Sequence, residues 1–151
     1  MIKIIHQSKN ADKLYRNLWD FNPVDKIIQY NGEDMDVQET IYKAIQSDTL
    51  DVFMVVDDNH IPIAYYGVTP LRRGVAELWL IRGVDFKLYP FQIIRATEDF
   101  VAYLFKNGIF RLEVAVLPKW ERWAKAIGFE FEHTCKKYDG ITDHKVFTRL
   151  R

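Results

Sequence analysis

Three things are scarce in this sequence: cysteine, long apolar runs and an excess of either charge. The single cysteine, Cys135, excludes an internal disulfide and fits a reducing compartment, so we expect a cytoplasmic protein. Basic and acidic side chains balance at 21 each, which gives no electrostatic reason to expect a nucleic acid or an anionic membrane as partner. No apolar run approaches the roughly 20 residues that cross a bilayer. Residues 1–8 also lack the apolar segment of a secretory signal.

Patterns typical of metal binding and of cysteine chemistry are missing as well. None of the four histidines is paired with a cysteine or a carboxylate at the spacing of metal ligands, so we expect no metal site. Cys135 falls in a predicted strand, and no histidine is placed to activate it. This favours a structural thiol over a nucleophile.

The sequence is rich in apolar and aromatic side chains. Hydrophobic residues make up 48% of the 151 residues and aromatic ones 15%, which argues against disorder. A chain of this length can bury one sizeable core. We therefore expect a single domain spanning residues 1–151.

The rest of the chain is organised around residues 75–107. Residues 75–81 are almost continuously apolar, which is typical of a strand covered on both faces. Residues 82–89 form a polar, turn-capable loop, and Pro90 suits the first turn of a helix that should run to residue 106. Asn107-Gly108 is a strong helix stop. The apolar residues at helical spacing, which should form the buried face, are Phe91, Ile93, Ile94, Phe100, Val101, Leu104 and Phe105.

The flanking segments predict further strands and helices. Asp36 and Glu39 resemble a capping box that opens a helix reaching about residue 47, and another helix is expected over residues 11–19. Residues 24–30 are ambiguous between helix and loop. Strands are expected at residues 2–5, 52–56, 61–68, 110–116, 129–138 and 142–150, the last of them at a sheet edge, with a short helix at 117–127. The fold class is thus α/β (α+β), a mixed central sheet of about six to seven strands flanked by helices, in the order β-α-α-β-β-β-α-β-α-β-β.

This order, together with the stretch Trp123-Ala-Lys-Ala-Ile-Gly-Phe129, resembles the GNAT superfamily of acyl-CoA N-acyltransferases. The resemblance covers nearly the whole chain but rests on order and spacing more than on invariant motifs. It implies that the parallel strands 75–81 and 110–116 separate after Ile81, and that the cleft between them faces the start of the long helix. A narrower resemblance is to GNAT-like proteins of tailed bacteriophages, including internal virion proteins.

In the superfamily, a glycine-rich loop after the central strand binds the pyrophosphate of acyl-CoA at a helix N-terminus. The corresponding loop here has only one glycine, Asp85 would repel phosphate, and Pro90 removes an N–H donor. Lys87 and Arg82 can partly compensate as charges. The resemblance places acetyl-CoA against Ile81, Arg82, Gly83, Lys87, Tyr89 and Phe91.

The superfamily also uses a carboxylate on the central strand to take a proton from the incoming amine. Glu77 matches that position, and burial beside apolar neighbours would raise its pKa toward useful values. The alternative is that Glu77 pairs with Arg72, Arg73 or another cation of a neighbouring strand. Glu113 is a similar but weaker candidate.

The third superfamily feature is a tyrosine that protonates the leaving thiolate, and its position here is Ala124. Tyr89, Tyr103 and Tyr138 remain as substitutes that spacing does not distinguish. Trp120 and Trp123 are interpreted as core packing.

Two functions stay open at this point. The first is an N-acyltransferase that uses acetyl-CoA and an amine acceptor, with Glu77 as base. The second is a GNAT-like phage protein without activity, which would act in a virion or the host cytoplasm by binding a protein partner or further copies of itself.

Overall fold

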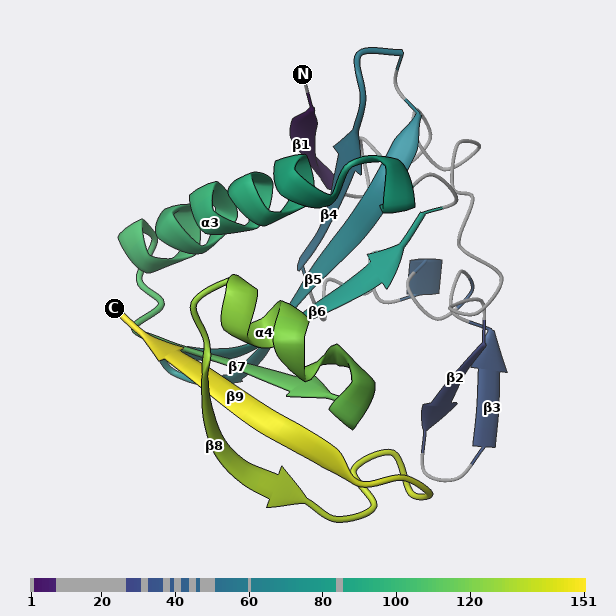
Figure 1. The fold of residues 1–151 in the computed structure, drawn as a ribbon, viewed down its shortest axis with the longest axis vertical. Coiled ribbons are helices and arrows are strands. Elements are labelled where there is room, and N and C mark those ends of the chain that lie inside the picture. The colour runs from purple at the N-terminus through teal and green to yellow at the C-terminus, as the bar shows by residue number, and fades with distance from the viewer. Residues whose placement is uncertain are drawn as a thin grey trace.

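A computed structural model describes residues 2–7, 27–30, 33–36, 39, 42–43, 46, 51–59, 61–83 and 86–151 of the chain. Within these ranges, seven strands form one mixed sheet in the order β1-β4-β5-β6-β7-β9-β8, with α3 and α4 packed on it (Figure 1). The strands are β1 Lys3–Gln7, β4 Asp51–Val56, β5 Pro62–Arg72, β6 Val75–Arg82, β7 Arg111–Val116, β8 Glu130–Cys135 and β9 His144–Leu150. The helices are α3 Pro90–Lys106 and α4 Glu121–Ala126, each preceded by a short 3-10 turn, η3 Phe86–Leu88 and η4 Pro118–Trp120. The predicted α/β class and the bounds of the long helix are confirmed.

The N-terminal third differs in part from its prediction. Strand β2, Ile27–Tyr30, pairs with β3, Glu33–Asp36, in a separate two-stranded sheet, so the interpretation of this stretch as helix or loop is wrong. In the sequence, Asn31-Gly32 stands between these two runs and is a hairpin signal. The cap is confirmed, because the Glu39 N–H donates to Asp36 Oδ1 at 2.8 Å. The helix expected over residues 11–19 lies outside the described residues.

The two helices bury their apolar sides against one face of the sheet. The α3 residues in this core are Ile93, Phe100, Val101 and Leu104, and Ala124 joins them from α4. Phe91, expected on the buried face, is 82% exposed, because at helical spacing it lies on the side of α3 opposite the buried residues Ile93 and Phe100. Polar groups also join helix to sheet: the Tyr66 hydroxyl donates to Thr97 Oγ1, and Thr97 in turn donates to the Ile93 carbonyl at 2.7 Å. Among the described residues, no helix is both long and apolar enough to cross a membrane.

A second, smaller core lies on the opposite face of the sheet. It is built from Val52, Met54, Val56, Tyr65 and Ile81, and Trp79 packs against it. Since side chains alternate along a strand, Glu77, Trp79 and Ile81 share this face, whereas Ala76 and Leu78 belong to the core under the helices.

Strands β6 and β7 pair over a short length and then diverge. They are parallel and paired at Val75↔Arg111, Ala76↔Leu112 and Glu77↔Glu113, and the rest of β6 has no partner on that side within the described part of the chain. Figure 1 shows the two arrows fanning apart beyond this point. We call the place where pairing ends, after Glu77 and Glu113, the fork. The expected separation is therefore present, but it begins before Leu78 rather than after Ile81.

The last strand is not at an edge. Strand β9 lies between β7 and β8 and pairs with both, so the edges of the described sheet are β1 and β8. The predicted edge position is wrong because, although β9 carries charged side chains, its Val146 and Phe147 are buried and the strand is paired on both sides. The exposed row that suits an edge is on β8, at Glu130, Glu132 and His133.

Gly67 provides the space for the indole of Trp79, its partner across β5 and β6. A Cβ at Gly67 would lie 1.7 Å from Trp79 Cε2, and the ring is fixed by its N–H bond to Thr69 Oγ1 at 3.2 Å. We therefore expect Gly67→Ala to lower the free energy of unfolding by about 1–3 kcal/mol, the usual cost of overpacking, in urea titrations.

The control is the same substitution in a Trp79→Val background. Without the indole the added methyl group should cost much less, so the two changes should be strongly non-additive. An equal cost of Gly67→Ala in both backgrounds would contradict the steric explanation.

Candidate active site

The site is built from the polar side chains that meet at the fork. Glu77 and Glu113 are direct neighbours on parallel strands, so their side chains share a face, the one turned away from α3 and α4. Two carboxylates held side by side raise each other's proton affinity unless another group compensates. The structure compensates each of them differently.

Glu77 is paired with a tyrosine. The Tyr138 hydroxyl donates to Glu77 Oε2 at 2.5 Å. Burial raises the pKa of Glu77 above its usual range, the hydrogen bond from Tyr138 opposes this, Glu113 adds to the rise, and His144 lowers it. The expected rise in the pKa is thus present. In the described structure, neither Arg72 nor Arg73 pairs with Glu77, so the ion-pair alternative is wrong for these two residues.

Tyr138 is held between Glu77 and a histidine. Its ring lies 4.9 Å, centroid to centroid, from the ring of His144 at the start of β9. Burial raises the pKa of Tyr138, and the hydrogen bond to Glu77 raises that pKa further, so the phenol stays protonated and remains a donor. Of the three substitute tyrosines, Tyr138 is therefore the one that reaches the candidate base.

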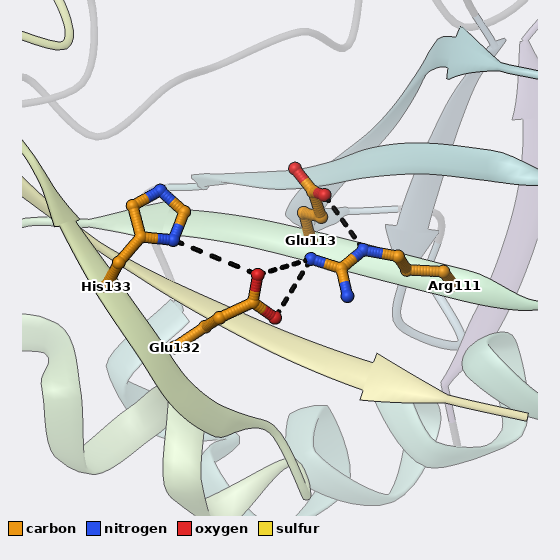
Figure 2. A network of polar contacts seen from close by, with 4 residues as sticks. All are labelled: Arg111, Glu113, Glu132 and His133. Atoms are coloured by element: carbon orange, nitrogen blue, oxygen red, sulfur yellow. Dashed lines mark hydrogen bonds and ion pairs between the residues drawn. The ribbon is translucent and has the colours of Figure 1, made fainter.

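Glu113 is paired with an arginine instead. Arg111 Nε donates to Glu113 Oε1 at 3.0 Å, and its Nη2 makes a two-pronged contact with Glu132 at 2.7 and 2.9 Å (Figure 2). His133 Nδ1 lies 3.9 Å from Glu132. The hydrogen bond from Arg111 is the main cause that holds the pKa of Glu132 below its usual range. Arg111 thus neutralises Glu113 and ties β7 to β8 across β9.

The proposed cofactor loop ends at a helix N-terminus without a side-chain cap. Tyr89 is the N-cap, Pro90 is the first helical residue, and no acidic residue lies in the first turn. The N–H groups of Phe91 and Gln92 have no partner among the described residues, since the first bond of the helix is made by Ile93 to Tyr89. These two amides and the positive end of the helix dipole can attract an anion.

The other residues predicted to bind the cofactor are placed unequally. Lys87 is exposed on η3, one turn before the helix, whereas Ile81 is buried in the second core. Gly83 is buried, its N–H donates to the Ile63 carbonyl at 2.8 Å, and an added Cβ would meet the Pro62 and Ile63 carbonyls. Gly83 therefore allows a close backbone approach and has no amide left for a phosphate.

Arg82, at the end of β6, contacts the turn that follows β7. Its guanidinium carbon lies 4.7 Å from the ring centre of Trp120, in the turn directly after β7. Lys119 Nζ lies 5.7 Å from the same ring. Two cations therefore lie against one aromatic ring in the turn after β7.

The remaining predictions concern packing. Ala124, at the position of the superfamily's acid, is fully buried, and Trp120 and Trp123 pack against the main core as expected. Tyr103 stacks on Phe100 away from the fork. No three potential metal ligands gather anywhere in the described ranges.

Sequence reasoning missed the roles of Arg111, Glu132 and His144, and it could not choose Tyr138. These residues are brought together by the pairing of β7, β9 and β8, so no local spacing marks them. The one available signal was the alternation of Glu130 and Glu132 with Phe129 and Phe131, which puts a carboxylate row on one face of β8.

Three solved structures from Vibrio cholerae share this fold. A single-substitution mutant of the spermidine N-acetyltransferase SpeG aligns with a TM-score of 0.73 at 15% identity, covering 99% of this chain and 93% of that one. A dodecameric spermidine N-acetyltransferase gives 0.66 at 16% identity, covering 99% and 93%. A proposed ribosomal-protein-serine acetyltransferase gives 0.63 at 14% identity, covering 76% and 71%.

These likenesses show that the chain shares its fold with GNAT-type acetyltransferases. They give no support to the narrower resemblance to phage proteins. The sequence matches no protein-family model, and the search of curated proteins found no relative.

The opposite pKa shifts of Glu77 and Glu132 predict opposite effects on stability. Because the folded-state pKa of Glu77 lies above its usual 4.5, the wild type should lose stability as the pH rises from about 4.5 through that raised pKa. Glu77→Gln removes this loss. The variant should therefore match the wild type near pH 4 and be more stable at pH 7, measured by urea unfolding across this range.

Glu132→Gln is the matched control. The pKa of Glu132 is lowered in the folded protein, so its ionised form stabilises the fold above the usual pKa, and that contribution is lost as the pH falls through the lowered value. Glu132→Gln should lower stability at pH 7. If Glu77→Gln also lowered the free energy of unfolding at pH 7, burial of the ionised Glu77 would carry no cost, contrary to the prediction.

Proposed function

We propose that this protein is an N-acyltransferase that transfers an acyl group from acyl-CoA to an amine. The observation that carries the proposal is the fork, where backbone pairing ends at a partly buried carboxylate whose pKa is raised. This is the chemistry that an amine acceptor needs, because an ammonium ion must lose a proton before its nitrogen can attack. The GNAT acetyltransferase fold supports the same reading at the level of architecture.

Glu77 is the proposed general base. Its Oε2 is held by Tyr138, and its Oε1 has no partner within the described residues, so one oxygen is left to receive a proton. Burial raises the pKa of the Glu77 carboxyl above its ordinary value, so its ionised form binds a proton more readily than an exposed glutamate does.

The neighbouring charges favour a cationic acceptor. Arg111 is engaged by Glu113 and Glu132, so it does not neutralise Glu77. Arg111 compensates the charge of Glu113, whereas the ionised Glu77 keeps its negative charge. This charge attracts an ammonium group and does not attract a neutral or an acidic substrate. We propose an amine that arrives protonated as the substrate class.

The acyl donor would be acetyl-CoA, which when bound supplies a thioester as the activated acyl group. The residues that fit its phosphates are the uncapped amides of Phe91 and Gln92, with positive charge from Lys87 and Arg82. In this proposal Tyr89 and Phe91 form the rim of the binding surface, and Ile81 and Gly83 hold its backbone in place.

Glu77→Gln tests the base. The amide keeps the shape of the side chain but cannot take a proton, so kcat/KM for acetyl transfer to an amine panel should fall about 10²- to 10⁴-fold. Acetyl-CoA affinity, measured by calorimetry, should be unchanged. Glu132→Gln is the control with the same chemical change on an exposed strand, and it should keep most of the activity.

Two results would contradict the proposal. Absence of acetyl-CoA binding at millimolar concentration, or turnover that is indifferent to Glu77→Gln, would remove the assignment.

Lys87→Gln tests the anion site. Removing a positive charge one turn before α3 should weaken acetyl-CoA binding about threefold, with the loss shrinking as salt is raised. Lys106→Gln deletes the same charge at the far end of the helix and should leave affinity unchanged. Equal effects of the two variants would point to general charge attraction rather than to a site at the helix N-terminus.

A further inference from the structure

The connection between β8 and β9, residues 136–143, carries the tyrosine that touches the candidate base. We propose that Tyr138 is a positioning residue, which orients the Glu77 carboxylate through Oε2 and keeps it ionised so that Oε1 is the oxygen that accepts the substrate proton. This inference rests on the proposed function and goes beyond it, since the superfamily features considered for this chain include no tyrosine on this connection.

The connection is organised by its own side chains. Asp139 Oδ1 accepts the N–H groups of Ile141 and Thr142 at 2.9 and 2.6 Å, and Asp139 Oδ2 accepts the Thr142 hydroxyl. The Tyr138 N–H donates to the Thr142 carbonyl at 2.9 Å. With these bonds the backbone of Tyr138 is fixed before any substrate arrives, so little conformational entropy remains to be lost at the site.

The residue before the tyrosine is held in a costly conformation. Lys137 has φ 50°, and it is the one residue other than glycine with positive φ in the described chain. Its N–H is bound by Asp143 Oδ1 at 2.9 Å, and its carbonyl accepts the Gly140 N–H. Strain of this kind persists only where the surrounding bonds enforce it, and it concentrates at functional sites. Here the strained residue directly precedes Tyr138, whose side chain reaches Glu77 on β6.

The groups around Glu77 leave Tyr138 as its direct stabilising partner. Glu113 on β7 disfavours the ionised form of Glu77, and His144 on β9 favours it electrostatically. Thr69, the partner of Glu77 on β5, carries no charge. Tyr138 itself stays protonated because burial and the nearby carboxylates raise its pKa. A neutral donor that does not titrate near neutral pH holds the carboxylate ionised without competing for the substrate proton.

The test measures the proton affinity of Glu77 without substrate. Protein labelled with ¹³C at glutamate side chains is titrated by NMR, and the Glu77 resonance is assigned by its loss in Glu77→Gln. Tyr138→Phe, which keeps the ring and removes the hydroxyl, should raise the proton affinity of Glu77 about tenfold, the factor carried by one hydrogen bond to a charged group. Asp139→Ala should shift it in the same direction by loosening the connection.

Tyr103→Phe is the matched control. It removes a phenol hydroxyl from α3, on the other face of the sheet, where that hydroxyl has no described hydrogen bond. Its Glu77 titration should coincide with that of the wild type. The acid limb of the kcat/KM profile should move with the NMR titration in Tyr138→Phe and stay in place in Tyr103→Phe.

The outcomes separate this inference from the proposed function. A Glu77 titration that is unchanged in Tyr138→Phe overturns the positioning role, and so does a uniform loss of activity at all pH values with no shift. A shifted titration in a protein that acetylates no amine supports the Tyr138–Glu77 coupling and refutes the acyltransferase assignment.

Discussion

The early end of pairing between β6 and β7 is the constraint on which the rest of the structure depends. Its last paired residues are both glutamates, so the fork forces two like charges together in a partly buried place. The protein resolves this in two ways, an arginine for Glu113 and a neutral hydroxyl for Glu77. The arginine compensates the charge of Glu113 and holds the strands together. The hydroxyl leaves Glu77 as a partly buried carboxylate, which costs stability and binds a proton more readily than an exposed one.

Polar side chains join the sheet to both helices on the side of the main core. Tyr66 and Thr97 link β5 to α3, while Arg149 on β9 donates to Glu98 on α3 and to the Ile127 carbonyl at the end of α4. An added Cβ at Gly128 would lie 2.9 Å from Arg149 Nη1, so the glycine after α4 makes room for this clamp. Arg149 therefore joins β9 to both helices, and the buried side chains of β6 and β7 pack with those of α3 and α4 in one core.

Most of the fold could be predicted from the sequence because its elements carry strong local signals. Pro90 and Asn107-Gly108 mark both ends of α3, and continuous apolar runs mark the strands. The strand order could not be predicted, and β9 shows why: its charges suggested an edge, yet pairing on both sides decides its place. The candidate site, too, could be predicted only in part. Glu77 stands out as a charge in an apolar strand, whereas Tyr138, 61 residues away, meets it only through long-range pairing.

The hairpin that carries Tyr138 also bears on how such a protein can diverge. Arg111 ties β8 to β7, and Asp139 and Asp143 fix the path from Cys135 to His144, so the length of this connection is set by its own bonds. Insertion or deletion of a single residue there would change the path of the chain and move the tyrosine hydroxyl away from Glu77. The fold could thus be inherited intact while the contact between Tyr138 and Glu77 is lost in one genetic step, so the length of this connection is worth comparing among distant relatives alongside overall similarity.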